Sequence, residues 1–533
     1  MSLFDNFTSA WSLVANLESF LALFGGIIIG VVAGAIPGMS ATMAVALTLP
    51  FTFALHPITG ILLLLGVYKG GIFGGSIPAI LIKTPGTPAS TATVLDGYPM
   101  AEKGQAGKAL SMALYASCTA DLISNLSLIL LAGWLASFAL SFGPPEFFTL
   151  ILFSLTIIAG VSGDSLIKGL LSAAFGLLLA TIGLDLVYGT NRFNFNNPNL
   201  MGGLNFIAVL IGLFAIPEIL AYVWQPRSSI DQVRSLGDQH VTLAEYRRSF
   251  VTIIRGSFIG VFLGAIPGIG AAPAAFLSYS EARRRSPNKK NFGKGEIEGV
   301  AASEAGNNGV AGATLIPLLA LGVPGDVITA IIIGAFMVHG LQPGPMMFVA
   351  NANIIYALFI GLILSSALLF VVGSVAVRMF RYIVDIPRSI LMPSVLILCV
   401  FGVFAVNNSV FDVIVMFVMG WIGYFMLRND IPAAPFLIAF ILGPLLEDNF
   451  RQSMLMSNGA AYILFRSYIT WFFWGTTLVT IVALVRSTLQ QSVGQPEQPA
   501  AATSPSHGSE EQRPRGSPIS PAVATSLSPG NEE

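Results

Sequence analysis

The chain has 533 residues, of which 54% are apolar and 10% are charged, and its formal net charge is −1. A mean hydropathy of +0.77 requires most of its surface to face lipid or other apolar helices, which excludes an ordinary soluble domain and predicts an all-α polytopic membrane protein. The near-zero net charge gives no support to nucleic-acid binding, so we expect no nucleic-acid partner.

Apolar segments follow one another along the chain as far as about residue 485. They lie at 19–36, 39–55, 58–82, 110–141, 147–161, 166–187, 204–224, 251–266, 268–280, 298–322, 325–338, 352–377, 390–406, 410–427, 433–446 and 465–485. Several are shorter than the roughly 20 residues that cross a bilayer as a helix, so we predict about 11–12 spans in total.

Changes of composition divide the chain into four parts. We assign residues 1–224 to a first membrane repeat, 225–250 to a cytoplasmic linker, 251–487 to a second membrane repeat plus a final span, and 488–533 to a disordered C-terminal tail. The linker is the one substantial polar stretch between apolar segments. The tail is rich in Gln, Ser, Pro, Gly and Glu and has too few large apolar residues to bury a core of its own.

Two phrases that interrupt helices occur once in each half. GAIPG stands at 34–38 and again at 264–268, and GGSIPAILIKTPGTP at 74–88 corresponds to GATLIPLLALGVPGDV at 312–327. The second pair aligns with an offset of 239 residues, from Pro78 to Pro317. Proline and glycine at membrane depth leave backbone groups without helical partners, which is tolerated where they line a cavity or a bound solute. The sequence therefore predicts a transporter built from two repeats with broken helices.

Lysine and arginine content differs between equivalent loops of the two halves. EARRRSPNKK at 281–290 is strongly basic, whereas its first-half counterpart has neither Lys nor Arg. Four pairs of loops are opposed in this way, and basic loops stay in the cytoplasm, so we predict that the repeats have inverted topology. The N-terminus is then external, while the C-terminal tail and the loops at 97–108, 225–250 and 281–297 are cytoplasmic.

The GAIPG segments themselves permit two interpretations. Both flanks of residues 251–280 are basic, although a segment that crosses once should have one cytoplasmic flank. We therefore favour re-entrant hairpins with their tips at Pro37-Gly38 and Pro267-Gly268. A single span broken at Pro-Gly is the alternative.

Polar residues beside the breaks are candidates for substrate binding. A half-helix N-terminus presents unpaired N–H groups and a partial positive charge, which suit a carboxylate. Lys69 lies in an apolar, glycine-rich segment, where its charge is costly unless it meets an anion or water; we predict that it contacts the substrate, with snorkelling to an interface as the alternative. The predicted substrate-binding residues are Gly38, Ser40, Thr42, Lys69, Thr84, Gly86, Thr87, Gly268, Asn307 and Asn308.

Carbonyl groups at the breaks, with Asn and Thr oxygens nearby, are candidate ligands for a coupling ion. We assign this role to Asn307, Asn308 and Thr314, with hydrogen bonding between helices as the alternative for the two asparagines. Asp121 and Glu304 lie in apolar stretches and are candidates for a proton relay, so Na⁺ and H⁺ coupling both stay open. We predict neither a metal site nor a cofactor.

Two long stretches resemble a known family. YKGGIFGGSIPAILIKTPGTPASTATVLDGYPMAEKGQAGKAL at 68–110 and SEAGNNGVAGATLIPLLALGVPGD at 303–326 resemble TctA, the large membrane subunit of the tripartite tricarboxylate transporters, and the resemblance extends from about residue 18 to 485. It implies a multi-pass protein of the bacterial inner membrane that imports tricarboxylates or related carboxylates. It also implies two partners, a small four-span membrane subunit (TctB-like) and a periplasmic solute-binding protein (TctC-like), and an ion gradient in place of ATP.

An anion channel or an intramembrane enzyme that uses the same broken helices is the alternative function. GQAGKA at 104–109 lacks the first Gly and the Ser or Thr of a phosphate-binding loop, and no arrangement of nucleophile and base is visible in the apolar segments. We therefore expect that the chain is not an enzyme. The sequence does not identify the carboxylate.

Overall fold

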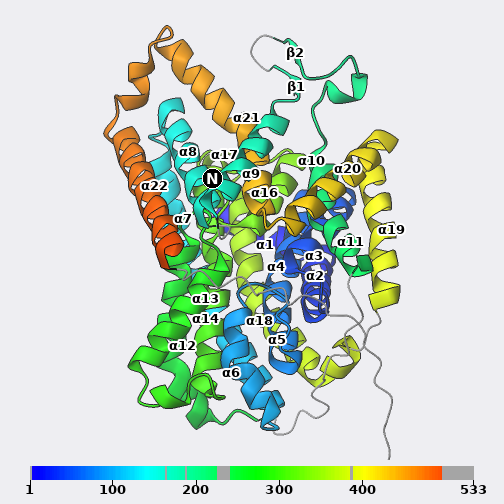
Figure 1. Cartoon of the computed structure of the whole chain (residues 1–533), viewed down its shortest axis with the longest axis vertical. Coiled ribbons are helices and arrows are strands. Elements are labelled where there is room, and N and C mark those ends of the chain that lie inside the picture. The colour runs from blue at the N-terminus through cyan, green and yellow to red at the C-terminus, as the bar shows by residue number, and fades with distance from the viewer. Residues whose placement is uncertain (1–2, 162–164, 186–188, 225–239, 385–387, 495–533) are drawn as a thin grey trace, which may run out of the picture. The chain divides into compact units, whose positions relative to one another are not determined.

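The computed structural model describes residues 3–161, 165–185, 189–224, 240–384 and 388–494. These residues are almost entirely helical (Figure 1), which confirms the all-α fold. The chain divides into two units, 1–488 and 489–533, and the following description concerns the first.

The elements before residue 225 include one short pair of antiparallel strands. In chain order they are α1 (Leu3–Val14), α2 (Leu17–Ala35), α3 (Ala41–Thr48), the 3₁₀ helix η1 (Leu49–Ala54), α4 (Pro57–Gly74), α5 (Ser76–Ile82), α6 (Thr91–Glu102), α7 (Ala106–Ala139), α8 (Pro144–Val161), α9 (Leu166–Ala180), β1 (Gly183–Leu184), β2 (Asn191–Arg192), η2 (Pro198–Leu200), α10 (Phe206–Phe214) and α11 (Ile216–Trp224). The sequence did not predict the β1-β2 pair.

The elements after residue 240 are all helices. They are α12 (Leu243–Gly264), α13 (Ala271–Arg285), η3 (Lys289–Asn291), α14 (Ile297–Ala313), α15 (Leu315–Leu321), α16 (Val327–Val338), α17 (Met347–Ala350), α18 (Ala352–Val384), α19 (Arg388–Asn407), α20 (Val410–Arg428), α21 (Ala433–Met456), η4 (Ala461–Phe465) and α22 (Tyr468–Gly494). Residues 243–250 of the predicted linker and 488–494 of the predicted tail are therefore helical. Residues 225–239 and 495–533 lie outside the described part of the chain.

Nine of the described helices are long and apolar enough to cross a membrane, fewer than the predicted 11–12. Four shorter apolar helices accompany them, at 41–54, 144–160, 166–180 and 327–338. The count is lower because helices that begin or end at a break, such as α16, are too short to cross alone.

In each half, the segment that contains GAIPG turns back on itself. Glu298, at the start of α14, accepts hydrogen bonds at 2.6 Å both from Thr252 on α12 and from Ser286, the residue after α13. The beginning of α12 and the end of α13 thus lie at the same end of α14, and the three helices lie side by side (Figure 1). This arrangement favours the hairpin over a single broken span.

The first half has the same arrangement around α4. Ser19 on α2 lies 2.9 Å from Thr59 on α4, hydroxyl to hydroxyl. A Cβ atom at Gly60 would lie 2.9 Å from the Cβ atom of Thr52, in the 3₁₀ helix that continues α3. Both arms of the hairpin therefore end beside the start of α4. The depth of either tip in a bilayer and the inversion of the halves stay predictions.

A second kind of interruption follows each hairpin. The helix breaks at Gly75 between α4 and α5 and at Thr314 between α14 and α15, three residues before a proline that has no N–H for the helical ladder. After α5 and again after α15, the chain reverses direction at a residue with a left-handed backbone conformation, Lys83 (φ 56°) in the first half and Gly322 (φ 72°) in the second. The helices α6 and α16 then begin back at the level of the breaks.

The close approach at each break explains its Pro-Gly pair. The N–H of Gly86 donates to the carbonyl of Gly75 at 3.0 Å, and a Cβ atom at Gly86 would lie 2.7 Å from the Cα atom of Gly75. In the second half, a Cβ atom at Gly325 would lie 2.7 Å from the Cα atom of Thr314. The N–H of Gly268, at the hairpin tip, donates to the carbonyl of Gly325 at 2.8 Å. The helix break, the turn and the hairpin tip therefore lie in contact. A residue larger than glycine at Gly86 or Gly325 would prevent this close approach.

Candidate functional site

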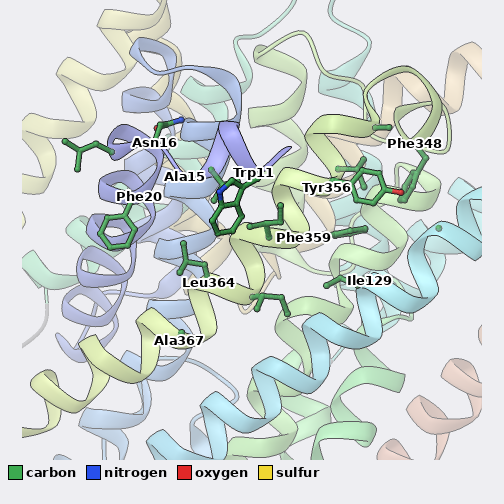
Figure 2. Close-up of a pocket in the computed structure, with 17 residues that line it drawn as sticks. Trp11, Ala15, Asn16, Phe20, Ile129, Phe348, Tyr356, Phe359, Leu364 and Ala367 are labelled. Carbon is green, nitrogen blue, oxygen red and sulfur yellow. The ribbon is translucent and has the colours of Figure 1, made fainter. Parts of the chain in front are cut away.

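A cavity of about 1240 Å³ lies between α1, α2, α7 and α18 (Figure 2). Its walls are mainly apolar, with Trp11, Phe20 and Phe359 among them. Asn16 also lines the cavity, but its carboxamide is hydrogen-bonded within the protein. The carboxamide oxygen accepts from the N–H of Ser19 at 2.7 Å, and the carboxamide nitrogen donates to the carbonyl of Leu13 at 2.8 Å. The cavity offers few donors to a carboxylate, so we place the polar site elsewhere.

The two breaks form two related polar centres. The first centre comprises the break at Gly75, the turn 84–90 and the start of α13; the second comprises the break at Thr314, the turn 323–329 and the start of α3. At the start of α6, the Thr87 hydroxyl accepts the N–H of Ser90 at 3.2 Å and lies 2.7 Å from its hydroxyl. Each centre thus contains the N-terminus of a half-helix, with its partial positive charge.

Asp326 and Thr329 occupy the corresponding positions in the second centre, at the start of α16. The Asp326 carboxylate accepts from the N–H and the hydroxyl of Thr329, both at 2.7 Å. The offset of 239 residues is the same as for the prolines. The centres therefore share a backbone plan and differ in charge, since Thr87 stands where Asp326 stands.

In the second centre, polar side chains form hydrogen bonds with one another. The Tyr68 hydroxyl donates to Asp326 at 2.9 Å and lies 3.2 Å from the hydroxyl of Thr314. Tyr68 is 1% exposed. At the N-cap of α3, which packs against α16, the Ser40 hydroxyl accepts the N–H of Met43 at 3.1 Å. The Tyr68 hydroxyl and the Asp326 carboxylate are thus paired with each other within the protein.

The first centre contains a buried donor that has no partner among the residues the structure describes. Asn307 occupies the position equivalent to Tyr68 and is 1% exposed, and its amide Nδ2 makes no hydrogen bond to any of these residues. A buried donor without a partner costs about 1–3 kcal/mol. Such a donor is rare unless a ligand or water completes it.

The packing of α14 against α6 determines where Asn307 points. Ser303 on α14 lies 3.1 Å from Thr93 on α6, hydroxyl to hydroxyl. Further along α6, Asp96 accepts from the N–H of Glu296, before α14, at 2.8 Å, so the two helices are antiparallel. Asn307 is one helical turn beyond Ser303 on the same face. It therefore faces the N-terminal end of α6.

The start of α13 completes the first centre. Ala271 and Ala275 of α13 pack against Ala89 and Ala92 at the start of α6. The residue before α13 is Gly270, which has no side chain to cap the helix, so its first N–H groups are not bonded by a capping side chain. Two half-helix N-termini and the Asn307 amide thus converge where the sequence predicted carboxylate binding.

The predicted substrate residues are distributed over both centres. Thr84, Gly86, Thr87 and Asn307 belong to the first, and Ser40 and Thr42 belong to the second, which also contains Thr314, predicted as a ligand of the coupling ion. Gly38 and Gly268 stand at the hairpin tips, and the N–H of Gly268 bonds to the turn of the second centre at Gly325. Sequence analysis did not select Tyr68 or Asp326. The repeat offset was the signal that could have found them, because they are equivalent to Asn307 and Thr87.

Lys69 lies away from both centres, in a buried ion pair. Its Nζ donates to Asp121 Oδ1 on α7 at 2.6 Å and to Asn125 Oδ1 at 2.8 Å, and both members of the pair are at most 1% exposed. Asp121 also accepts from Ser366 on α18 at 2.5 Å. Lys69 therefore does not snorkel, and a protein carboxylate balances its charge. Its contact with an anionic substrate stays a prediction that this pairing disfavours.

Glu304 is another buried carboxylate, and among the described residues only neutral groups bond to it. Its Oε1 accepts from Ser76 on α5 at 2.6 Å and from Thr93 on α6. Its Oε2 accepts from Ser117 on α7 at 3.0 Å and from Asn308 Nδ2 at 3.2 Å. The Asn308 amide also donates to Ser117 at 2.8 Å, which supports the structural alternative for this asparagine.

Comparisons with known proteins agree with this architecture. The Tripartite tricarboxylate transporter TctA family matches residues 20–438. An Agrobacterium vitis protein named "Uncharacterized 52.8 kDa protein in TAR-I ttuC' 3'region" is 34% identical over 463 residues, which are 87% of this chain and 92% of that protein. The "Uncharacterized protein in TAR-II ttuC' 3'region" of the same organism is 35% identical over 223 residues, 42% of this chain and 92% of that protein. No solved structure matches the chain.

Proposed function

The chain belongs to the tripartite tricarboxylate transporter TctA family, and we propose that it is the large permease subunit of a binding-protein-dependent importer driven by an ion gradient. Membership makes it a membrane component of these transporters. Nine helices in the described part of the chain are long and apolar enough to span a membrane, which is consistent with a multi-pass protein. The finer proposal adds the bacterial inner membrane as its location and tricarboxylates or related carboxylates as its substrates.

The carboxylate binds at the first centre in this proposal. The unpartnered amide of Asn307 carries the argument, because it is a buried donor aimed at the N-terminus of α6. The uncapped N–H groups of α13 add further donors and partial positive charge. A substrate carboxylate would accept hydrogen bonds from all of these groups together, whereas in the second centre the Tyr68 hydroxyl already donates to Asp326.

Two further subunits complete the proposed transporter. One is a small four-span membrane protein, and the other is a periplasmic solute-binding protein that delivers the carboxylate. The family name itself describes a tripartite system, which supports both. Uptake that proceeds equally well without the binding protein would contradict this proposal and favour the anion channel.

The test replaces Asn307 with leucine, which is similar in volume and has no donor. Removing a donor that has no partner among the described residues should leave the stability of the apo protein unchanged or increase it, because apolar replacement removes the desolvation cost. Binding of citrate, measured by calorimetry on the purified protein, should weaken by about 1.5–3 kcal/mol, or roughly 10- to 150-fold, for a lost charge-assisted hydrogen bond.

Asn449→Leu is the matched control, because this asparagine donates to a carbonyl on its own helix, α21, at 2.7 Å and lies outside both centres. Its citrate affinity should equal that of the wild type. If Asn307→Leu unfolds more readily and binds citrate normally, the asparagine is structural and the proposed site is wrong.

A further inference from the structure

We propose that Glu304 is the proton-binding residue that couples transport to a proton gradient. The inference rests on the proposed function and deepens it, because it names the coupling ion and the group that carries it. Glu304 is 0% exposed, and in the described part of the chain no Lys, Arg or His forms an ion pair with it. Its charge is therefore balanced only by neutral donors.

The other buried carboxylates on α6, α7 and α14 are bonded to other partners. On α6, Asp96 lies one turn beyond Thr93 and accepts from the Tyr279 hydroxyl at 2.9 Å. On α7, Asp121 lies one turn beyond Ser117 and is paired with Lys69 of α4. On α14 itself, Glu298 accepts from two hydroxyls at the base of the hairpin, and α5 contains no charged residue. None of these groups neutralises Glu304.

The partners of Glu304 suit both of its protonation states. Three of the four are hydroxyls, on Ser76, Thr93 and Ser117, and a hydroxyl can either donate or accept. A protonated Glu304 can donate to one of them after that hydroxyl rotates, so no buried group loses its partner. Asp121 differs, because it accepts from the ammonium group of Lys69, which can donate but cannot accept.

A file of hydroxyls connects Glu304 with the first centre. The Ser76 hydroxyl donates to Glu304 Oε1 at 2.6 Å and lies 3.4 Å from the hydroxyl of Ser90. The Ser90 hydroxyl lies 2.7 Å from the hydroxyl of Thr87, a residue that is partly exposed. With Glu304 ionised, each hydroxyl donates toward the carboxylate. With Glu304 protonated, the file reverses and the Thr87 hydroxyl becomes free to donate to a substrate carboxylate.

The proton balance of this step is complete. One proton from the external solution enters at Thr87; each hydroxyl accepts one proton and passes one on, and the carboxylate of Glu304 becomes a carboxylic acid. After the substrate is released, Glu304 gives up one proton to the cytoplasm and becomes a carboxylate again. Protonation of Glu304 removes a negative charge near the first centre and makes the Thr87 hydroxyl available as a donor there. Proton binding therefore strengthens carboxylate binding, and carboxylate binding strengthens proton binding by the same factor.

The first test detects the proton directly and needs no substrate. Infrared difference spectra of the purified protein in lipid vesicles, recorded between acid and alkaline pH, should contain the C=O band of a buried carboxylic acid. Glu304→Gln should lack this band, and Glu298→Gln, on the same helix but outside the file, should retain it. A wild-type spectrum without the band, or a band that persists in Glu304→Gln, overturns the proposal.

The second test separates coupling from translocation. Vesicles that contain the complete transporter are given a pH gradient, and accumulation of radiolabelled citrate is compared with exchange of internal for external citrate. Wild type and Glu298→Gln should do both. Glu304→Gln should exchange within about twofold of the wild-type rate but should not accumulate citrate. Ser76→Ala interrupts the file while leaving Glu304 in place, and it should slow accumulation more than exchange.

The outcomes distinguish the two proposals. Accumulation by the wild type that follows a Na⁺ gradient and ignores the pH gradient would overturn Glu304 as the coupling residue and leave the proposed importer intact. The same conclusion follows if Glu304→Gln accumulates citrate as the wild type does. If the wild type neither accumulates nor exchanges citrate, the proposed tricarboxylate importer fails, and the coupling role of Glu304 fails with it.

Discussion

Replacing Lys69 with glutamine removes one member of a buried ion pair and leaves Asp121 in the protein interior. The two groups lie 2.6 Å apart and are at most 1% exposed, so water cannot solvate the remaining carboxylate. Removal of one partner from such a pair costs about 3–5 kcal/mol, which corresponds to roughly a 10²- to 10⁴-fold change in the unfolding equilibrium. We therefore expect Lys69→Gln to be poorly folded.

The double variant Lys69→Gln/Asp121→Asn removes both charges and separates the two interpretations of Lys69. Two amides can hydrogen-bond to each other and to Asn125, so the double variant should recover most of the stability lost in the single one. If Lys69 serves the fold, the double variant should also transport citrate. If Lys69 binds the substrate, as the sequence predicted, the double variant should fold and fail to transport.

The assay is a double-mutant cycle. Unfolding of the wild type, both single variants and the double variant is measured in detergent, and citrate uptake is measured at matched membrane abundance. We expect a coupling energy of about 2 kcal/mol or more between the two positions. Single variants as stable as the wild type would refute the reasoning, because the pair would then carry no energetic weight.

Tyr68→Phe should lower the free energy of unfolding by about 1.5–3 kcal/mol, because Asp326 loses a hydrogen bond, while calorimetric citrate affinity stays within about twofold since this is the second centre. Gly86→Ala should prevent accumulation of folded protein, because its Cβ atom would lie 2.4 Å from a backbone carbonyl oxygen of the first hairpin; normal membrane abundance would contradict this. Single cysteines in place of Lys103 and Phe195, both exposed, should label from the cytoplasm and the periplasm respectively, and labelling of both from one side would contradict the predicted topology.

The two centres show how one backbone plan supports different chemistry. Where the second centre has Tyr68 and Asp326, the first has Asn307 and Thr87. The Tyr68 hydroxyl donates to Asp326 within the second centre, whereas the shorter side chain of Asn307 leaves its amide donor without a partner among the described residues. The repeat therefore conserves the backbone geometry that exposes helix N-termini, while the side chains determine which N-terminus is available to a ligand.

The sequence by itself determined the all-α membrane fold, the helix breaks and the family resemblance. These follow from local rules: apolar runs require lipid or apolar neighbours, proline lacks an N–H, and glycine permits close backbone approach. The positions of Pro78 and Pro317 thus located both breaks, and the basic flanks of residues 251–280 indicated a segment that turns back.

Only the tertiary structure decided which polar groups are paired. Lys69 and Asp121 are 52 residues apart in the sequence, and Tyr68 and Asp326 are 258 residues apart. No local sequence pattern predicts either pair. The energy of a buried charge or donor depends on the few atoms within hydrogen-bonding distance, and helix packing alone sets those. Hence Lys69, the strongest candidate from sequence, is paired with Asp121, whereas the Asn307 amide has a donor without a partner in the described part of the chain.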